Sequence, residues 1–197
     1  YTLSHTLSLH DALPISSQLA ALTTSQVQAG LTTAQVVALS TGQIQSLTTG
    51  QVVAPSTTQV AALETRDVAA LKTSQVAVLT TDQVQSGLTT TQVAALTTGQ
   101  VALGLTTAQV VALSTAQVQS LTTGQVVSLS TNNVAALETQ DVAALKTSQI
   151  QALKTSQVAA LTTDQVAPGL TTAQIVALTT GQVSSGLTTG QIAALTT

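Results

Sequence analysis

A repeat of eight residues runs through this sequence from Ser16 to Thr197 and constrains its fold more than any other feature. The chain contains about twenty-two consecutive octads of the form L-T/S-T-x-Q-V-x-A/S, and residues 31–38 (LTTAQVVA) are a typical copy. We number the positions of the octad from one, at its leucine, to eight. Because a single octad is too short to bury its apolar side chains, the octads have to stack against one another.

The polar half of the octad has the pattern of a helix start. A threonine at an N-cap accepts a hydrogen bond from a free backbone N–H, and a glutamine three residues later bonds back to the cap. Thr32 and Gln35 have this spacing, and Leu31 and Val36 have the spacing of a hydrophobic staple. The constancy of threonine at position three favours instead a cap one residue later, at Thr33. Either choice restarts a helix in every octad.

Two other regular structures fit the octad less well. In one continuous helix, eight residues advance about 800° at roughly 100° each, so the apolar stripe drifts by about 80° per octad and no face stays apolar. A flat amphipathic strand fails because positions one and six have opposite parity and point to opposite faces. A β-solenoid with corners inside each octad remains as an alternative, which the threonine and valine content favours.

Five octads carry a ninth residue, a glycine directly before the next leucine: Gly30, Gly87, Gly104, Gly169 and Gly186. A glycine just past the end of a helix, followed by an apolar residue, predicts a left-handed C-terminal cap. The sequence therefore predicts an all-α fold, a solenoid or superhelix of very short helices restarted every eight residues. The β-solenoid is the alternative.

The composition argues against several kinds of binding partner for this chain, among them nucleic acid and the membrane interior. Phe, Trp, Met and Cys are absent and Tyr1 is the sole aromatic residue, so the core is built from Leu, Val, Ile and Ala, without disulfides or thiolate metal sites. Four Lys and Arg residues in a chain of net charge −3 are too few to neutralise a row of phosphates. No apolar run is long enough to span a membrane. We therefore expect no nucleic-acid binding and no membrane span.

Residues 1–15 (YTLSHTLSLHDALPI) do not follow the octad. Residues 6–15 resemble a translated sequencing-library adapter, and residues 1–5 resemble a partial second copy of it. We expect this segment to be an adapter-derived artefact outside the fold. His5, His10 and Asp11, the one group of metal-ligand or catalytic type, are then expected to form no site.

Residues 16–197 are predicted to form a single octapeptide-repeat solenoid. The array begins and ends within an octad, so we expect a fragment truncated at both ends. One whole extra octad, residues 153–160 (LKTSQVAA), increases the spacing between segments that are otherwise alike. Since the chain gains octads whole, eight residues are the structural unit.

Charged residues gather in two similar clusters: Glu64, Arg66, Asp67 and Lys72, and then Glu138, Asp141, Lys146 and Lys154. Glu64 and Lys72 occupy the same position in adjacent octads, so they would form an exposed ion pair, worth about 0–1 kcal/mol, if adjacent octads stacked in register. The simpler interpretation is a solvated face that limits aggregation. A ligand or metal site is not expected here, because calcium binding requires more clustered oxygen ligands.

The threonine and glutamine rows are the one extended chemical feature. We interpret them as capping and ladder hydrogen bonds, with an ordered hydroxyl array that binds ice or polysaccharide as the alternative. After Ser16 the chain has no His, Cys or aromatic residue. It therefore lacks a catalytic nucleophile with its base, and we predict no enzyme activity, no catalytic, cofactor-binding or metal-binding residues and no cofactor.

The segments LTTAQVVALST, LTTDQV and LETQDVAALKTSQ resemble the Thr-, Gln- and Ala-rich arrays of giant bacterial surface proteins, including adhesin-like ones. This resemblance implies a non-catalytic stalk or spacer in a bacterial cell-surface or secreted protein. The location would be extracellular or at the cell surface, and the partners would be neighbouring domains of a longer chain. The alternative is a module that self-associates into fibres or binds a surface such as ice or polysaccharide.

Overall fold

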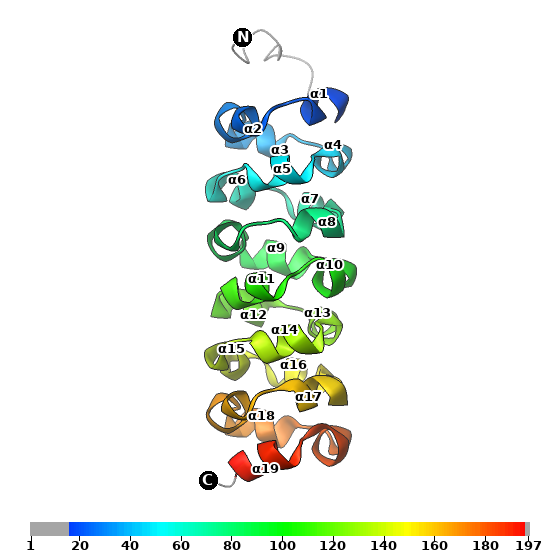
Figure 1. The fold of residues 1–197 in the computed structure, drawn as a ribbon, viewed down its shortest axis with the longest axis vertical. Coiled ribbons are helices and arrows are strands. Elements are labelled where there is room, and N and C mark those ends of the chain that lie inside the picture. The colour runs from blue at the N-terminus through cyan, green and yellow to red at the C-terminus, as the bar shows by residue number, and fades with distance from the viewer. Residues whose placement is uncertain (1–15, 196–197) are drawn as a thin grey trace. The chain divides into compact units, whose positions relative to one another are not determined.

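A computed structural model describes residues 16–195, so the predicted adapter-derived segment, residues 1–15, lies outside the described residues. The chain divides into two compact units, Tyr1–Leu96 and Thr97–Thr197. Every regular element between residues 16 and 195 is helical (Figure 1), and no strand occurs in this range. The all-α prediction is confirmed, and the β-solenoid alternative is not supported. That residues 16–197 form a single solenoid stays a prediction.

The described residues of the first unit, 16–96, form ten short helical segments: α1 (Ser16–Ala20), α2 (Thr24–Gly30), α3 (Thr33–Val37), α4 (Thr41–Ser46), α5 (Thr49–Val53), α6 (Thr57–Ala62), α7 (Thr65–Ala70), α8 (Thr73–Val76), η2 (Gln83–Gly87) and α9 (Thr90–Ala95).

The second unit continues the pattern over its described residues: α10 (Thr98–Leu103), α11 (Thr107–Ala112), α12 (Thr115–Ser120), α13 (Thr123–Ser128), α14 (Thr131–Ala136), α15 (Thr139–Ala144), α16 (Thr147–Ala152), α17 (Thr155–Ala160), η3 (Gln165–Gly169), α18 (Thr172–Ala177), η4 (Gln182–Gly186) and α19 (Thr189–Leu195). Helices of about one and a half turns restart in every octad.

The N-cap of most helices is the residue at octad position two. Thr32 is extended (φ −76°, ψ 160°) and its hydroxyl accepts a bond from the Gln35 N–H at 3.3 Å. In return the Thr32 N–H donates to Gln35 Oε1 at 2.9 Å, which completes the capping box. Leu31 and Val36, the predicted staple, are both buried. The structure therefore places the cap at Thr32, and Thr33 is the first helical residue.

Each helix stops because two extended residues follow it. Leu63 (φ −58°, ψ 140°) ends α6, and its N–H still donates to the Val60 carbonyl at 3.1 Å. Glu64 (φ −74°, ψ 152°) is extended as well and is the N-cap of α7. The octad therefore divides into about six helical and two extended residues, and the leucine lies at the corner.

Some octads carry Glu or Lys at the cap and make no side-chain cap bond. At Lys72 the N–H of Gln75 bonds instead to the Lys72 carbonyl at 2.9 Å. The Lys72 N–H still donates to Gln75 Oε1 at 2.8 Å. The glutamine half of the capping box is thus kept where the hydroxyl half is lost.

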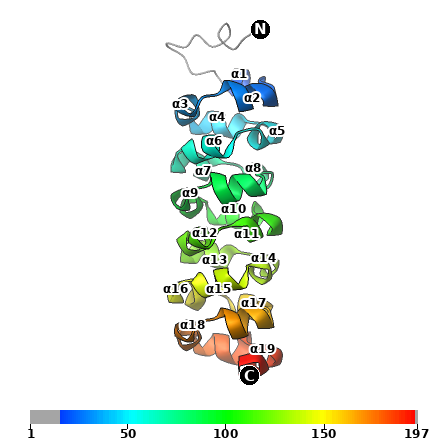
Figure 2. The ribbon, with the colours of Figure 1, turned by 90° about the vertical axis from the view of Figure 1, so that its left-hand side faces the viewer.

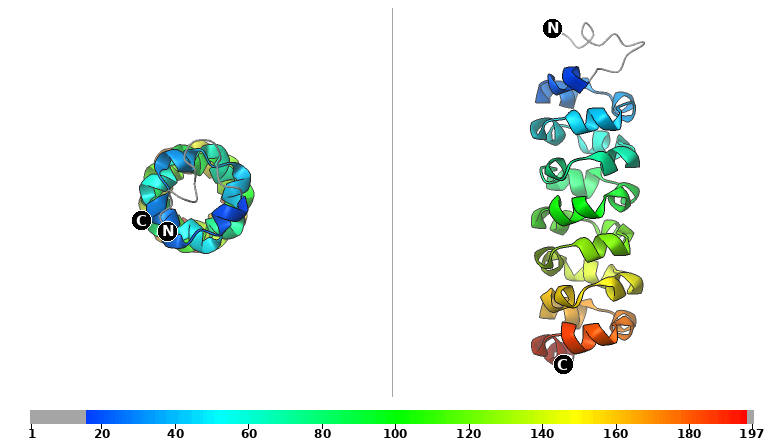
Figure 3. Two further views of the ribbon diagram at one scale, coloured as in Figure 1. Left: turned by 90° about the horizontal axis from the view of Figure 1, so that it is seen from above. Right: turned by 90° about the vertical axis from the view of Figure 1, so that its right-hand side faces the viewer.

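Within each unit a helix packs against the third helical segment after it. In the first unit α4 contacts α1 and α7, and α7 contacts α9 across α8 and η2. In the second unit α13 contacts α10 and α16 in the same way. The ribbon views show the helices of each unit following one another around successive turns (Figures 2 and 3). The prediction of a solenoid of short helices holds within each unit.

The core of each unit is thin and apolar. Position-six residues such as Val68 and Val118 are fully buried, and position-one residues such as Leu71 and Leu121 are nearly so. Positions two to four are mostly exposed. Because nearly every octad supplies one leucine and one valine or isoleucine, the core repeats along each unit without aromatic side chains.

The ninth-residue glycines do not form left-handed caps, so that prediction is wrong. No described glycine has a positive φ. Gly87, Gly169 and Gly186 instead end π-helical segments, and the Leu88 N–H reaches back five residues to the Gln83 carbonyl at 2.8 Å. Gly104 precedes a similar bond, from the Leu105 N–H to the Gln100 carbonyl at 3.0 Å. A wider turn absorbs one extra residue, so the following leucine still reaches the core.

The π segments need glycine because the neighbouring turn lies close. A Cβ on Gly87 would lie 3.1 Å from Val60 Cβ, whereas a Cβ on Gly42 would have no neighbour within 4 Å. We therefore expect Gly87→Ala to lower the free energy of unfolding by about 1–3 kcal/mol through overpacking. Gly42→Ala, the matched control in helix α4, is expected to raise it by about 0.5–1 kcal/mol. Urea unfolding followed by circular dichroism measures both, and equal effects would contradict the packing.

The capping geometry predicts a difference between two residues at the same helical position. The Thr122 hydroxyl accepts from the Gln125 N–H at 3.2 Å, whereas the Lys154 side chain caps nothing. Thr122→Ala should lower the free energy of unfolding by about 1 kcal/mol, and Lys154→Ala should leave it within about 0.5 kcal/mol. Thermal unfolding of the two variants provides the comparison. A Lys154→Ala loss as large as that of Thr122→Ala would argue against the cap.

Candidate functional site

The predicted group of His5, His10 and Asp11 lies outside the described residues. Between residues 16 and 195 no three His, Cys, Asp or Glu side chains come together as a metal site would require. No helix in this range is both long enough and apolar enough to cross a bilayer. The candidate site therefore has to be sought in the threonine and glutamine rows and in the charged clusters.

The threonine and glutamine rows separate in the structure. The hydroxyl-bearing residues at positions two and three are mostly exposed, whereas nearly all the position-five glutamines are buried. Only 2% of the surface of Gln92 and 1% of that of Gln149 is exposed to solvent. A carboxamide buried this completely has to find hydrogen-bond partners for its oxygen and its nitrogen.

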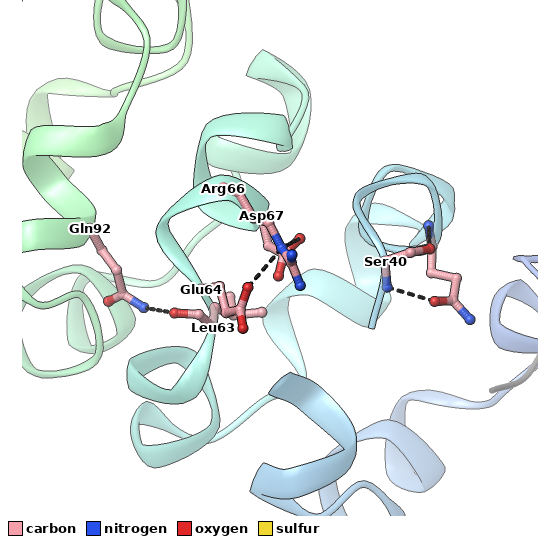
Figure 4. Close-up of polar contacts among 7 residues, drawn as sticks. Ser40, Leu63, Glu64, Arg66, Asp67 and Gln92 are labelled. Atoms are coloured by element: carbon pink, nitrogen blue, oxygen red, sulfur yellow. Dashed lines mark hydrogen bonds and ion pairs between the residues drawn. The ribbon is translucent and has the colours of Figure 1, made fainter. Parts of the chain in front are cut away.

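Gln92 shows where these partners lie. Its Oε1 accepts from the Thr89 N–H at 2.7 Å, as the capping box requires. Its Nε2 donates to the carbonyl of Leu63 at 2.7 Å (Figure 4) and to that of Val60 at 3.0 Å. These carbonyls lie at the end of α6, where the regular i→i−4 bonds of the helix stop, and the Val60 carbonyl also accepts from the Leu63 N–H at 3.1 Å. One side chain therefore closes the start of its own helix and the end of a helix one solenoid turn earlier.

The same bridge recurs in the second unit with nearly constant geometry. Nε2 donates to a position-one carbonyl at 2.6–2.8 Å in each of three consecutive octads: Gln149 to Leu121, Gln157 to Leu129, and Gln165 to Leu137. The donor and acceptor are 28 residues apart in all three. A separation of 28 residues is three and a half octads, so each turn holds between three and four of them.

The constant threonine at position three also contacts the next turn. A Cβ on Gly50 would lie 3.7 Å from Thr24 Cγ2, and a Cβ on Gly124 would lie 3.6 Å from Thr98 Cγ2. The Thr107 hydroxyl donates to Asn133 Oδ1 at 3.2 Å. We therefore attribute the constancy of position three to stacking and not to capping.

The charged cluster of the first unit pairs differently from the expectation. Arg66 Nε lies 2.7 Å from Glu64 Oε2 and 3.9 Å from Asp67 Oδ1 (Figure 4). Among the described residues Glu64 pairs with Arg66 and not with Lys72. The predicted Glu64–Lys72 pair is wrong because each helix packs on the third segment after it and not on the next one.

Three octads replace the position-five glutamine with a shorter side chain, and these are the chemically unusual places of the array. Asn133 still donates from Nδ2 to the Leu105 carbonyl at 3.3 Å. Asp67 is 0% exposed and Asp141 is 1% exposed, and neither carboxyl group has a hydrogen bond of good distance and angle. Buried acids that lack a well-formed hydrogen bond are rare and require a physical explanation.

The surroundings of the two acids act in both directions on their ionisation. Burial raises the pKa of Asp67, the Arg66 guanidinium lowers it in part, and the Glu64 carboxylate raises it further. Burial also raises the pKa of Asp141. There the Thr115 hydroxyl and the Glu138 backbone N–H act to lower the pKa, and the Glu138 carboxylate acts to raise it. The net shift is upward for both, so folding makes the neutral form of each acid more favourable than it is in the unfolded chain.

A small apolar cavity lies in the core of the first unit. Its volume is ≈ 40 Å³, and leucine and valine side chains such as Leu39 and Val60 make up most of its lining, together with Pro55, which replaces a larger leucine at position one. Ligand pockets typically enclose about 300–1,000 Å³. We attribute this cavity to incomplete packing around Pro55 and not to a ligand site.

Sequence reasoning identified the capping role of glutamine and missed its bond to the previous turn. A signal was present, because position five stays Gln in octads such as 71–78 and 145–152, whose cap is lysine. A residue that served only the capping box would not need to persist there. The distance of 28 residues to its acceptor cannot be read from an eight-residue repeat.

The bridge predicts that two glutamines of helix α16 contribute differently to the free energy of unfolding. Gln149 is buried and bonded, whereas Gln151 is exposed. Gln149→Leu keeps much of the volume but leaves the Leu121 carbonyl and the Lys146 N–H without this partner, which should cost about 1–3 kcal/mol for each group that stays unsatisfied. Gln151→Leu should change the free energy of unfolding by less than about 0.5 kcal/mol. Urea unfolding at one pH measures both, and a Gln149→Leu variant as stable as the parent chain would rule out the bridge.

Comparison with known families gives one match. Residues 60–98, 103–131, 134–168 and 169–197 match the family model described as the ALTTAQ repeat, and together these segments cover most of the chain. No curated protein and no solved structure matches the sequence. The matched segments begin and end at various positions of the octad, as expected for a repeat with a shorter internal period.

Proposed function

This chain belongs to the ALTTAQ repeat family, and we propose that it is a non-catalytic spacer or stalk of a bacterial cell-surface or secreted protein. The observation that carries the proposal is the recurrence of one set of contacts in octad after octad. Buried glutamines such as Gln92 and Gln157 each join two helices of their own unit. Length is then set by the number of octads, and stiffness by the bonds between turns.

The absence of varied surface chemistry among residues 16–195 also supports a spacer. Most of the outer positions carry Thr, Ser, Ala or Gly, and the charged side chains are few. A spacer needs a soluble surface that repeats, whereas an enzyme needs one place where different functional groups converge. We infer an extracellular or cell-surface location from the resemblance of these arrays to those of giant surface proteins, with neighbouring domains as the partners.

Self-association is the second candidate. Position-seven valines leave apolar surface exposed, among them Val37, Val53 and Val111, and Val176 is 80% exposed. Exposed apolar side chains favour contact with another surface when they are contiguous. A fibre-forming, ice-binding or polysaccharide-binding module would use this outer surface together with the threonine hydroxyls.

Sedimentation distinguishes the two candidates. A spacer should sediment as a monomer at all concentrations, because its apolar core is satisfied within the chain. A sedimentation coefficient that rises with concentration would contradict the spacer and support self-association. Val111→Thr combined with Val176→Thr is the matched variant, since it should abolish such a rise if the valines cause it.

A deletion tests whether length is set in whole octads. Removing residues 153–160 leaves every remaining octad intact, so the shortened chain should keep a cooperative thermal transition and show a smaller maximum dimension in X-ray scattering. Removing only residues 153–156 is the control, because it shifts Leu and Val out of register and should abolish the transition of the second unit. Equal tolerance of the two deletions would contradict the proposal.

A further inference from the structure

The acids Asp67 and Asp141 occupy the position from which glutamine donates to the previous turn. A carboxylate has no hydrogen to donate, so an ionised acid leaves the acceptor on that turn without its partner. The bridges on either side of Asp67 identify that acceptor: Gln59 donates to the Leu31 carbonyl and Gln75 to the Leu47 carbonyl. In each of these two pairs the donor and the acceptor are 28 residues apart. The same spacing assigns the Leu39 carbonyl to Asp67.

The corresponding acceptor for Asp141 is the carbonyl of Leu113. The neighbouring octads again fix the register, since Asn133 donates to Leu105 and Gln149 donates to Leu121. Within residues 16–195 no donor reaches the carbonyl of Leu39 or that of Leu113. Each acid therefore occupies the place of a bridging glutamine, and the leucine carbonyl that this glutamine would bond has no donor among the described residues.

Asn133 shows that a side chain of this length reaches across the turn. Asparagine and neutral aspartic acid have nearly the same shape, and both carry a donor at the end of the side chain. The Asn133 Nδ2 group lies 3.3 Å from the Leu105 carbonyl. An Asp67 or Asp141 carboxylic acid in the same geometry has its O–H directed at the leucine carbonyl.

We propose that Asp67 and Asp141 are held in the folded array as neutral carboxylic acids, each donating its proton to the position-one leucine carbonyl of the previous turn, and that each unit thereby contains one proton-sensitive joint. On ionisation the proton passes to solvent, and the carboxylate and the leucine carbonyl, both buried acceptors, then have no hydrogen between them. Two buried polar groups without a hydrogen bond cost free energy, so ionisation weakens the packing between the two turns at this place.

Few other charges act on either joint. Helices α4 and α9, which pack against α7, contain no ionisable residue, so Arg66 and Glu64 are the charged groups beside Asp67. Arg66 is mainly paired with Glu64, at 2.7 Å, and lies 3.9 Å from the acid.

Asp141 has no cation in the place of Arg66, where the sequence has Gln140. Helix α12 contains no ionisable residue, and η3 begins after the exposed Asp164. The carboxylate of Glu138, the N-cap of α15, disfavours the ionisation of Asp141. The second unit therefore has the stronger electrostatic reason to keep its acid neutral.

The direction of the pH dependence follows from the raised pKa values of both acids. Between the ordinary aspartate pKa of about 3.9 and the raised value, the folded chain binds more protons than the unfolded chain. The free energy of unfolding is therefore highest in acid, falls as the pH rises through this window, and levels off above the raised pKa. Surface carboxylates in favourable pairs give the opposite trend.

The test is a series of thermal unfolding curves of the whole chain from about pH 4 to about pH 8. The parent chain should lose at least about 2 °C in Tm across this range. Asp67→Asn combined with Asp141→Asn supplies permanent donors, as at Asn133, so its Tm should be nearly independent of pH and above that of the parent at neutral pH. The matched control, Asp82→Asn with Asp164→Asn at exposed positions, should keep the parent's pH dependence.

Two results would overturn the proposal. One is a parent Tm that rises with pH over the same range, and the other is an Asn double variant that keeps the parent's pH dependence. Should the Asn variant not fold, carboxyl carbon NMR of the parent chain decides. The resonances of Asp67 and Asp141 should titrate above the ordinary aspartate pKa of about 3.9, and titration of both at that value would exclude the neutral acids.

Discussion

The fold depends on the two ends of one carboxamide. A helix of six residues cannot satisfy its own termini, because its first N–H groups and last carbonyls have no partner within it. The oxygen of Gln92 bonds the start of its own helix, and its nitrogen bonds the end of α6, one turn earlier. The polar ends of very short helices thereby become the contacts that stack them. Burial of one leucine and one valine per octad supplies the apolar surface that closes around these bonds.

The elements that could be predicted from the sequence are those set within one octad. The all-α class, the restart of a helix every eight residues, the capping box and the burial of positions one and six all follow from local spacing. The partner of each glutamine could not be predicted, since it lies about 28 residues away and depends on how many octads close a turn. The glycines misled for a related reason. A glycine before a leucine indicates a left-handed cap when only neighbouring residues are considered. Here the glycine is needed because Val60, on the neighbouring turn, lies close to Gly87.

A repeat in which one polar side chain carries the stacking has a functional consequence. Copies can be gained without new contacts having to evolve, as residues 153–160 illustrate, and the outer surface is free to remain uniform. This property suits the spacer role that we propose. It also means that replacing the glutamine at position five changes the contact between two turns. Asp67 and Asp141 therefore affect stacking more than the exposed charges around them do.

Hydrogen exchange of glutamine side chains tests the central role of the carboxamide most directly, because the chain contains buried and exposed glutamines in the same helices. The Nε2 hydrogens of Gln149 and Gln157 should exchange with solvent as slowly as the protected backbone amides of their helices. Those of the exposed Gln119 and Gln151 should exchange at the rate of an unstructured peptide. If the two groups exchanged equally fast while the backbone stayed protected, the glutamine bridge between turns would be contradicted.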